Sequence, residues 1–268
     1  MTASPELLFV FGLLLKIVMT AGIVVVASVV VERSGPFIGA LIASLPTAGG
    51  AALIILAVEH PAAFVAASVI GSMVSVVISA VFALTYAALA QRHSLVGSLV
   101  GAFVVWFGPV LLSRLVPWTA LSASLLAVVV FPLTIYLGSR FRDEGKARAK
   151  IELTHRDLAW RAGVVTLCVI LVTAASTAIG PYLSGVFAFF PVAMSSFFII
   201  LHSRIGGKAA GSVAAHLQAP LIGLMPGFLA VHYLAVPAGI WWSYLVGLAI
   251  CLAWSALLWF ARQPRLTQ

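Results

Sequence analysis

The sequence predicts an all-α polytopic membrane protein with about nine transmembrane helices, built as two inverted four-helix repeats joined by one extra helix. Of its 268 residues, 63% are hydrophobic and only 8% are charged, and the mean hydropathy is +1.17. Soluble domains carry about 25% charged residues. Several stretches exceed the ~20 apolar residues that a helix needs to cross a bilayer. They lack the alternation in ~10-residue segments that a transmembrane β-barrel would show.

Polar and helix-breaking residues divide the chain into nine predicted spans. The narrowest division is at Gly180-Pro181, where the Gly-Pro break is expected to turn the chain. The first span has no basic stretch before it and is longer than a signal-peptide core, so we expect it to be retained as a helix. The predicted spans are 7–31, 36–58, 62–90, 95–115, 118–139, 160–178, 181–203, 208–233 and 237–261.

One segment of the chain occurs twice. Residues 35–56, GPFIGALIASLPTAGGAALIIL, recur without a gap at 180–201, GPYLSGVFAFFPVAMSSFFIIL, and the same register aligns Lys16 with Arg161. We interpret this as a duplication, although chance alignment of apolar segments is the alternative. Residues 1–115 and 159–268 are then the two four-helix repeats, and residues 116–158 are a linking transmembrane helix and a basic cytoplasmic loop. Five helices precede the second repeat, and this odd number inverts it, as in many transporters.

The basic residues predict the orientation in the membrane. The net charge is +8, and six Arg and Lys residues lie in the predicted loop 140–158. Short cytoplasmic loops collect such residues, so we expect the N-terminus outside and the C-terminus in the cytoplasm. Because the basic excess has this topological explanation, we expect no nucleic-acid partner. The expected partners are membrane lipid and a small-molecule solute, and self-association into a homo-oligomer is left open.

Two internal prolines mark the candidate binding site. Pro46 and Pro191 each follow their Gly-Pro by ten residues, which is about 15 Å along a helix and near the middle of a ~30 Å core. A proline inside a helix frees the carbonyl four residues before it, here those of Ile42 and Phe187. Two such breaks that meet at mid-depth would form a binding site. The alternative is that the prolines only bend helices for packing.

Polar side chains follow both prolines and lie in neighbouring spans. Lys16 lies about a third of the way into its span and is expected to face the bundle interior, as most intramembrane cations do. Arg161 lies at the end of its span and is expected to snorkel to the interface. His216 can titrate or bind a ligand, although a packing histidine is the alternative. The predicted substrate-binding residues are Pro46, Thr47, Pro191, Ser195, Ser196, Lys16, His216 and Gln218.

The distribution of acidic residues indicates the charge of the solute. None of the seven Asp and Glu residues lies deep in a predicted span. The deep polar groups are cationic, histidyl, amide or hydroxyl, which favours a neutral or anionic solute. No metalloprotease, hydrolase or nucleotide-binding motif occurs, and the two cysteines lie in apolar spans without ligand spacing. We therefore expect no enzymatic activity, no cofactor and no metal.

A short motif in the second copy resembles a known family. The run Gly185-Val186-Phe187-Ala188-Phe189-Phe190-Pro191, with a weaker copy from Ala40 to Pro46, resembles the GlpM-like family of bacterial inner-membrane proteins. The resemblance covers about two helices of each half. Members of this family are about half as long, which would suit one repeat as an ancestral unit. The resemblance implies the bacterial inner membrane and assigns no functional residues.

These observations predict a transporter. We expect the protein to move a small or amphiphilic, neutral or anionic solute across the inner membrane by alternating access. The principal alternative is a non-transporting scaffold or assembly factor for envelope or polysaccharide production. A third reading is an intramembrane enzyme that acts on lipid, for which the sequence offers only His216 and scattered hydroxyl groups.

Overall fold

The described part of the chain is entirely helical. The computed structural model describes residues 47–142 and 154–262, together with a few positions between 14 and 26, and these ranges contain no β-strand. Six helical elements there are long and apolar enough to cross a membrane, judged by length and composition. The predicted class, a helical membrane protein, is therefore confirmed. Most of the predicted first span and the beginning of the second lie outside the described residues.

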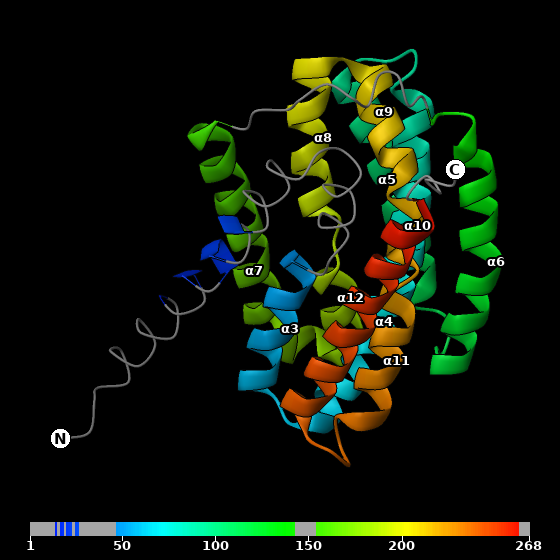
Figure 1. Ribbon diagram of the computed structural model, residues 1–268. Helices are drawn as coiled ribbons and strands as arrows, with labels where there is room; N and C mark the ends of the chain where they lie inside the picture. The colour runs from blue at the N-terminus through cyan, green and yellow to red at the C-terminus, as the bar shows by residue number, and fades with distance from the viewer. Residues whose placement is uncertain are drawn as a thin grey trace.

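The helices follow one another with short connections (Figure 1). Helices α4, α5, α6 and α12 lie where spans 62–90, 95–115, 118–139 and 237–261 are predicted. The helices are α3 (Thr47–Glu59), α4 (Ala62–Leu89), α5 (Leu95–Ser113), α6 (Ala120–Ser139), α7 (His155–Ala188), α8 (Val192–Ile205), α9 (Gly207–His216), α10 (Gln218–Leu221), α11 (Leu224–Leu234) and α12 (Ile240–Arg262).

The α7 segment is a hairpin and not one long helix. Gly180 has φ 76° and ψ 174°, outside the helical region, within α7. The guanidinium carbon of Arg161 lies 5.2 Å from the ring centre of Phe197, and Asp157 pairs with Arg204. Members of each pair stand almost equally far before and after Gly180, so the chain reverses there, as Figure 1 shows. The turn predicted at this Gly-Pro is confirmed, and only glycine adopts such a φ without strain.

Helix α4 is the centre of the bundle. It packs against α5, α6, α7, α9 and α11. In its most apolar stretch 78% of the residues are buried, compared with 11% in the corresponding stretch of α12. Four serines repeat along α4 at intervals of three or four residues and are all buried, namely Ser68, Ser72, Ser75 and Ser79. Small residues on a membrane helix allow neighbouring backbones to approach closely.

The closest approach is between α4 and the second arm of the hairpin. A Cβ atom placed on Gly71 would lie 2.0 Å from the carbonyl oxygen of Tyr182. A Cβ atom placed on Gly185 would lie 1.6 Å from the carbonyl oxygen of Ser68. The hydroxyl of Ser72 donates a hydrogen bond of 3.1 Å to the Gly185 carbonyl. The two helices can therefore lie in backbone contact because the glycines have no side chains, and the Ser72 hydroxyl adds a hydrogen bond between them.

Helix boundaries recur along the chain. Helices α4 and α9 begin at Ala62 and Gly207. Helices α5 and α12 begin at Leu95 and Ile240. Each pair stands 145 residues apart, which is also the spacing of the two copies at 35–56 and 180–201.

Helix α4 and the α9–α11 segment run antiparallel. The side-chain amide of Gln218 donates to the carbonyl of Ala80 at 3.0 Å, and the imidazole of His232 donates to the carbonyl of Ala66 at 2.7 Å. Moving 14 residues forward on one segment therefore corresponds to moving 14 residues back on the other. Figure 1 shows the two segments crossing the bundle in opposite directions.

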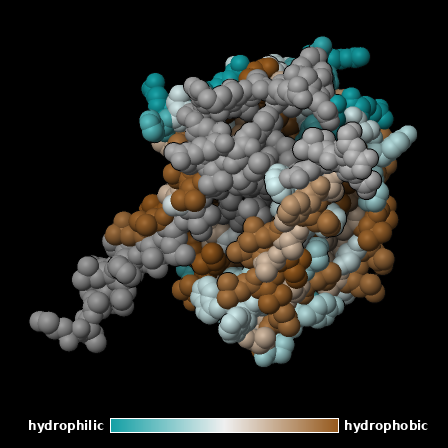
Figure 2. All heavy atoms as spheres, in the orientation of Figure 1, coloured by the Kyte–Doolittle hydropathy of each residue, from teal (hydrophilic) through white to brown (hydrophobic). Residues whose placement is uncertain are grey.

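The outer surface is apolar over the flanks and polar at one end. Hydrophobic residues cover much of the visible face in Figure 2, and hydrophilic residues gather at its upper end. Exposed large side chains lie on α5, α6 and α12, and Trp241 and Trp242 are exposed in the first turn of α12. This distribution is typical of lipid-facing helices, with tryptophans near their ends.

We predict that Gly185→Ala lowers the thermal unfolding midpoint of the detergent-purified protein. The added methyl group meets backbone, which cannot rotate away, and overpacking of this kind costs about 1–3 kcal/mol. The matched control is Gly163→Ala in the first arm of α7, because a Cβ atom there has no neighbour within 4 Å. Equal unfolding midpoints for the two variants would contradict the close approach.

Candidate functional site

The helix is interrupted between α7 and α8, at the predicted position. Helix α7 ends at Ala188, and Pro191 caps α8 with φ −73° and ψ 39°. The carbonyl of Phe187 was expected to lose its partner, but it accepts a hydrogen bond of 3.0 Å from the N–H of Phe190. That expectation is wrong because the last turn tightens, so that a residue three positions on replaces the missing donor.

The serines of α4 supply the remaining donors at the break. The hydroxyl of Ser75 donates to the carbonyl of Phe189 at 3.2 Å, and Ser72 bonds to Gly185 one turn earlier. In lipid an unpaired backbone carbonyl is costly, so broken helices persist only where protein or water satisfies them. Here α4 satisfies them, and the break is fixed to the most buried helix.

Ser195 and Ser196 lie in the first turn and a half of α8, directly after the break. The Ser195 hydroxyl donates to the carbonyl of Pro191 at 2.6 Å, and the Ser196 hydroxyl donates to Ala193 at 3.0 Å. Both side chains are buried. In this state their protons are used within α8, the usual back-bonding of serine in a helix, and only lone pairs remain for a ligand.

Aromatic rings surround the break. Phe190 stacks near Phe103 with ring centres 5.6 Å apart and meets Trp106 edge-on at 5.0 Å. On the other side Phe189 meets Phe228 of α11 edge-on at 4.8 Å. The indole N–H of Trp106 donates to Ser79 of α4 at 3.2 Å. The break is therefore closed and apolar in this conformation.

The beginning of α3 lies against the same break. Thr47 is the first described residue of α3, and two residues later a Cβ atom on Gly49 would meet the ring of Phe189. Pro46 and the side chain of Thr47 lie outside the described residues, as does Lys16. The residues that directly follow the first predicted break are thus in contact with the second break.

His216 and Gln218 lie where α9 ends and α10 begins. The imidazole of His216 contacts the carbonyl of Ser212 through Nδ1 at 2.8 Å. Gln218 is fully buried, donates to Ala80 of α4, and packs near Gly138 of α6. Its side-chain carbonyl oxygen has no hydrogen-bond partner among the residues that the structure describes. Gln218 therefore joins α9–α11 to α4, and it retains one buried acceptor.

Arg161 was expected to snorkel, and the structure places it differently. The residue is only 6% exposed, and its Nε and Nη1 atoms are buried with no hydrogen-bond partner in the described part of the chain. The snorkelling interpretation is wrong because the hairpin places α8 across the side chain, with Phe197 under the guanidinium at 5.2 Å. The sequence signal was the alignment of Arg161 with Lys16, which marks one isolated cation in each copy.

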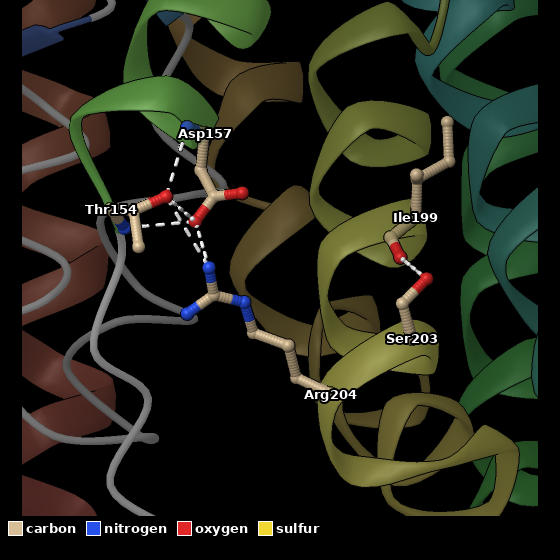
Figure 3. Close-up of polar contacts among 5 residues, drawn as sticks. All are labelled: Thr154, Asp157, Ile199, Ser203 and Arg204. Atoms are coloured by element: carbon tan, nitrogen blue, oxygen red, sulfur yellow. Dashed lines mark hydrogen bonds and ion pairs between the residues drawn. The ribbon is translucent and has the colours of Figure 1, made fainter.

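A polar cluster closes the open end of the hairpin (Figure 3). Thr154 caps α7, and the side chains of Thr154 and Asp157 bond reciprocally to each other's backbone N–H. Arg204, near the end of α8, donates to Asp157 and, at 3.4 Å, to the Thr154 hydroxyl. Figure 3 also shows the Ser203 hydroxyl turned back to the Ile199 carbonyl, 2.8 Å away. This end is held by charge, unlike the apolar break.

Comparisons with protein-family models, with curated proteins and with solved structures find no match to this chain. The resemblance to the GlpM-like family therefore stays a prediction from the motif.

We predict a small, salt-dependent coupling between Asp157 and Arg204. A double-mutant cycle with Asp157→Asn and Arg204→Gln, followed by unfolding of the purified protein, should give about 0.2–1 kcal/mol at low salt, because the pair is partly exposed. The coupling should decrease as salt screens the charges. Arg156→Gln, on an exposed neighbour in the same turn, is the control. A coupling that does not change with salt would contradict an ion pair.

Proposed function

We propose that the protein is a membrane transporter that moves a small or amphiphilic, neutral or anionic solute by alternating access. Its two inverted repeats would be residues 1–115 and 159–268, joined by the α6 span and the basic loop. Inverted repeats suit this mechanism because an axis in the membrane plane exchanges the two faces of the protein. The 145-residue spacing of the helix boundaries and the antiparallel pairing of α4 with α9–α11 support the proposal.

The pairing of α4 with α9–α11 supports a two-fold axis at the middle of α4. Interpolation between the Gln218–Ala80 and His232–Ala66 contacts places Val76 opposite Ile222 and Val77 opposite Leu221. These residues are also each other's counterparts at the 145-residue spacing. The pairing is thus symmetric about the middle of α4, which spans Ala62–Leu89.

The α7–α8 break lies at this level. Ser75, next to Val76, donates to Phe189 in this break. Leu221, opposite the same point, ends the short helix α10, where the α9–α11 segment is irregular but keeps helical backbone angles. Transporters commonly bind solute where a discontinuous helix lies at mid-depth between inverted repeats. The position of this break is the observation that favours transport.

The membrane setting follows from charge and length. We propose the bacterial inner membrane, in contact with lipid, with the N-terminus outside and the C-terminus in the cytoplasm. The polar end of the bundle, which carries Thr154, Asp157 and Arg204, would face the cytoplasm. One four-helix repeat would then correspond to the shorter GlpM-like proteins as an ancestral unit.

The second candidate is a non-transporting scaffold or assembly factor. It is favoured by the dry packing of the break, where aromatic rings from α5 and α11 enclose Phe189 and Phe190. A scaffold would keep this packing at all times, whereas a transporter must open it to water from each side in turn. Water access to the break therefore distinguishes the two functions.

We predict that a cysteine at position 75 reacts with a membrane-impermeant maleimide from both faces of the membrane. The test uses Ser75→Cys in a Cys168→Ala, Cys251→Ala background, in right-side-out and inside-out vesicles. Alternating access brings the mid-depth break to each aqueous side in turn, so slow labelling is expected in both preparations.

The control for this labelling is Val128→Cys on the outer face of α6, where the side chain is 70% exposed but would face lipid. It should react only with a membrane-permeant maleimide. If Ser75→Cys resists the impermeant reagent from both sides, the transport proposal fails and the scaffold is favoured.

A further inference from the structure

Arg161 is a buried cation without a counter-charge. No hydrogen bond or ion pair reaches its guanidinium within residues 47–142 and 154–262, and two of its three nitrogens are covered completely. A buried, unpaired charge is far less favourable than a paired one. In a membrane helix an ionisable residue of this kind usually marks a binding or transport pathway.

The nearest carboxylate is engaged elsewhere. Asp157 precedes Arg161 by four residues, the spacing at which an acid and a base on one helix can pair. Its Oδ2 atom instead accepts hydrogen bonds from the N–H and hydroxyl of Thr154 and from Arg204 (Figure 3). The fold therefore neutralises Asp157 with a different cation and leaves Arg161 its full positive charge.

The guanidinium of Arg161 contacts an aromatic ring and keeps unused donors. The ring of Phe197 lies 5.2 Å, centre to carbon, from the guanidinium carbon, which is within the range of a cation–π contact. The Nε and Nη1 donors are buried and have no acceptor among the described residues. Guanidinium donors match the two oxygens of a carboxylate or phosphate, which would reach them when the packing around Arg161 opens.

The surroundings are apolar. Ala162 and Val165, which flank this part of α7, belong to a buried cluster with Ala52 and Ile55 of α3 and Val192 of α8. A ligand that brings an oxyanion to Arg161 would therefore have its remaining part among hydrocarbon side chains. This combination of one positive group and an apolar environment suits an amphiphilic anion.

We propose that Arg161 binds the oxyanion of an amphiphilic solute, a carboxylate or phosphate group attached to an apolar tail. This names the solute class of the proposed transport. Movement of the anion depends on the proposed transport function, whereas binding of the anion to Arg161 does not. Asp157 would not repel the incoming anion, because Arg204 neutralises it. The same shared chemistry occurs in a free fatty carboxylate and in the headgroup of an anionic lipid.

Thermal unfolding of the full chain in a neutral maltoside detergent tests the proposal. Octanoate represents a free amphiphilic carboxylate, phosphatidylglycerol represents an anionic lipid, and octanol is the uncharged match. Wild-type protein should gain stability saturably with octanoate, with phosphatidylglycerol or with both, because a ligand that binds only the folded state stabilises it. The ligand that stabilises the protein identifies the source of the oxyanion. Octanol should give no saturable gain.

The variants separate binding from structure. Arg161→Gln should raise the apparent dissociation constant at least tenfold, Arg161→Lys should give an intermediate value, and the exposed neighbour Arg156→Gln should leave it unchanged. Without ligand, Arg161→Gln should unfold at the same temperature as wild type or higher, since it removes an unpaired buried charge.

Three outcomes would overturn the inference: equal stabilisation by octanol and octanoate, unchanged anion binding in Arg161→Gln, or a large loss of stability in this variant without ligand. Maleimide labelling at position 75 is independent of all three. Anion binding with no labelling would remove transport and keep the site, and labelling with no anion binding would do the reverse.

Discussion

The close approach of α4 to the second arm of the hairpin is the constraint on which the other features depend. Gly71 and Gly185 bring the two backbones together, and Ser72 and Ser75 then reach the carbonyls of Gly185 and Phe189. Without this approach the break after Ala188 would leave backbone groups unpaired at mid-depth, which a membrane protein cannot tolerate. Small residues on α4 therefore make the interruption of its neighbour stable.

The two ends of the hairpin are held by different interactions, and the difference suits a gated path. The break at Pro191 is packed by aromatic contacts, and at the Gly180 turn the Ser184 hydroxyl donates to the Gly180 carbonyl at 2.7 Å. At the opposite end the described residues include the ion pair of Asp157 with Arg204. Partly exposed ion pairs contribute little free energy, so this end can open at smaller cost than the packed middle.

Much of the architecture could be predicted from the sequence, and particular side-chain environments could not. The Gly180 turn and the start of α8 after Pro191 follow from local backbone chemistry, so these two described boundaries lie where the sequence places them. The partner of the Phe187 carbonyl and the burial of Arg161 depend on tertiary packing. The Phe187 carbonyl finds a partner because the last turn of α7 tightens. Arg161 is buried because α8 places Phe197 beside α7. Pro46 and Lys16 lie outside the described residues and stay predictions.

The two copies of the repeated sequence differ chemically at matching positions. Phe197 of the second copy corresponds to Ala52 of the first, and Gly71 of the first corresponds to His216 of the second. The counterpart of Arg161 therefore lacks an aromatic ring at the matching position, and the counterpart of the closest helix approach carries an imidazole. A symmetric scaffold can exchange its two conformations while only one half holds the anion. In the proposed transporter the duplication would supply the motion, and the divergence of the copies would supply the recognition of the solute.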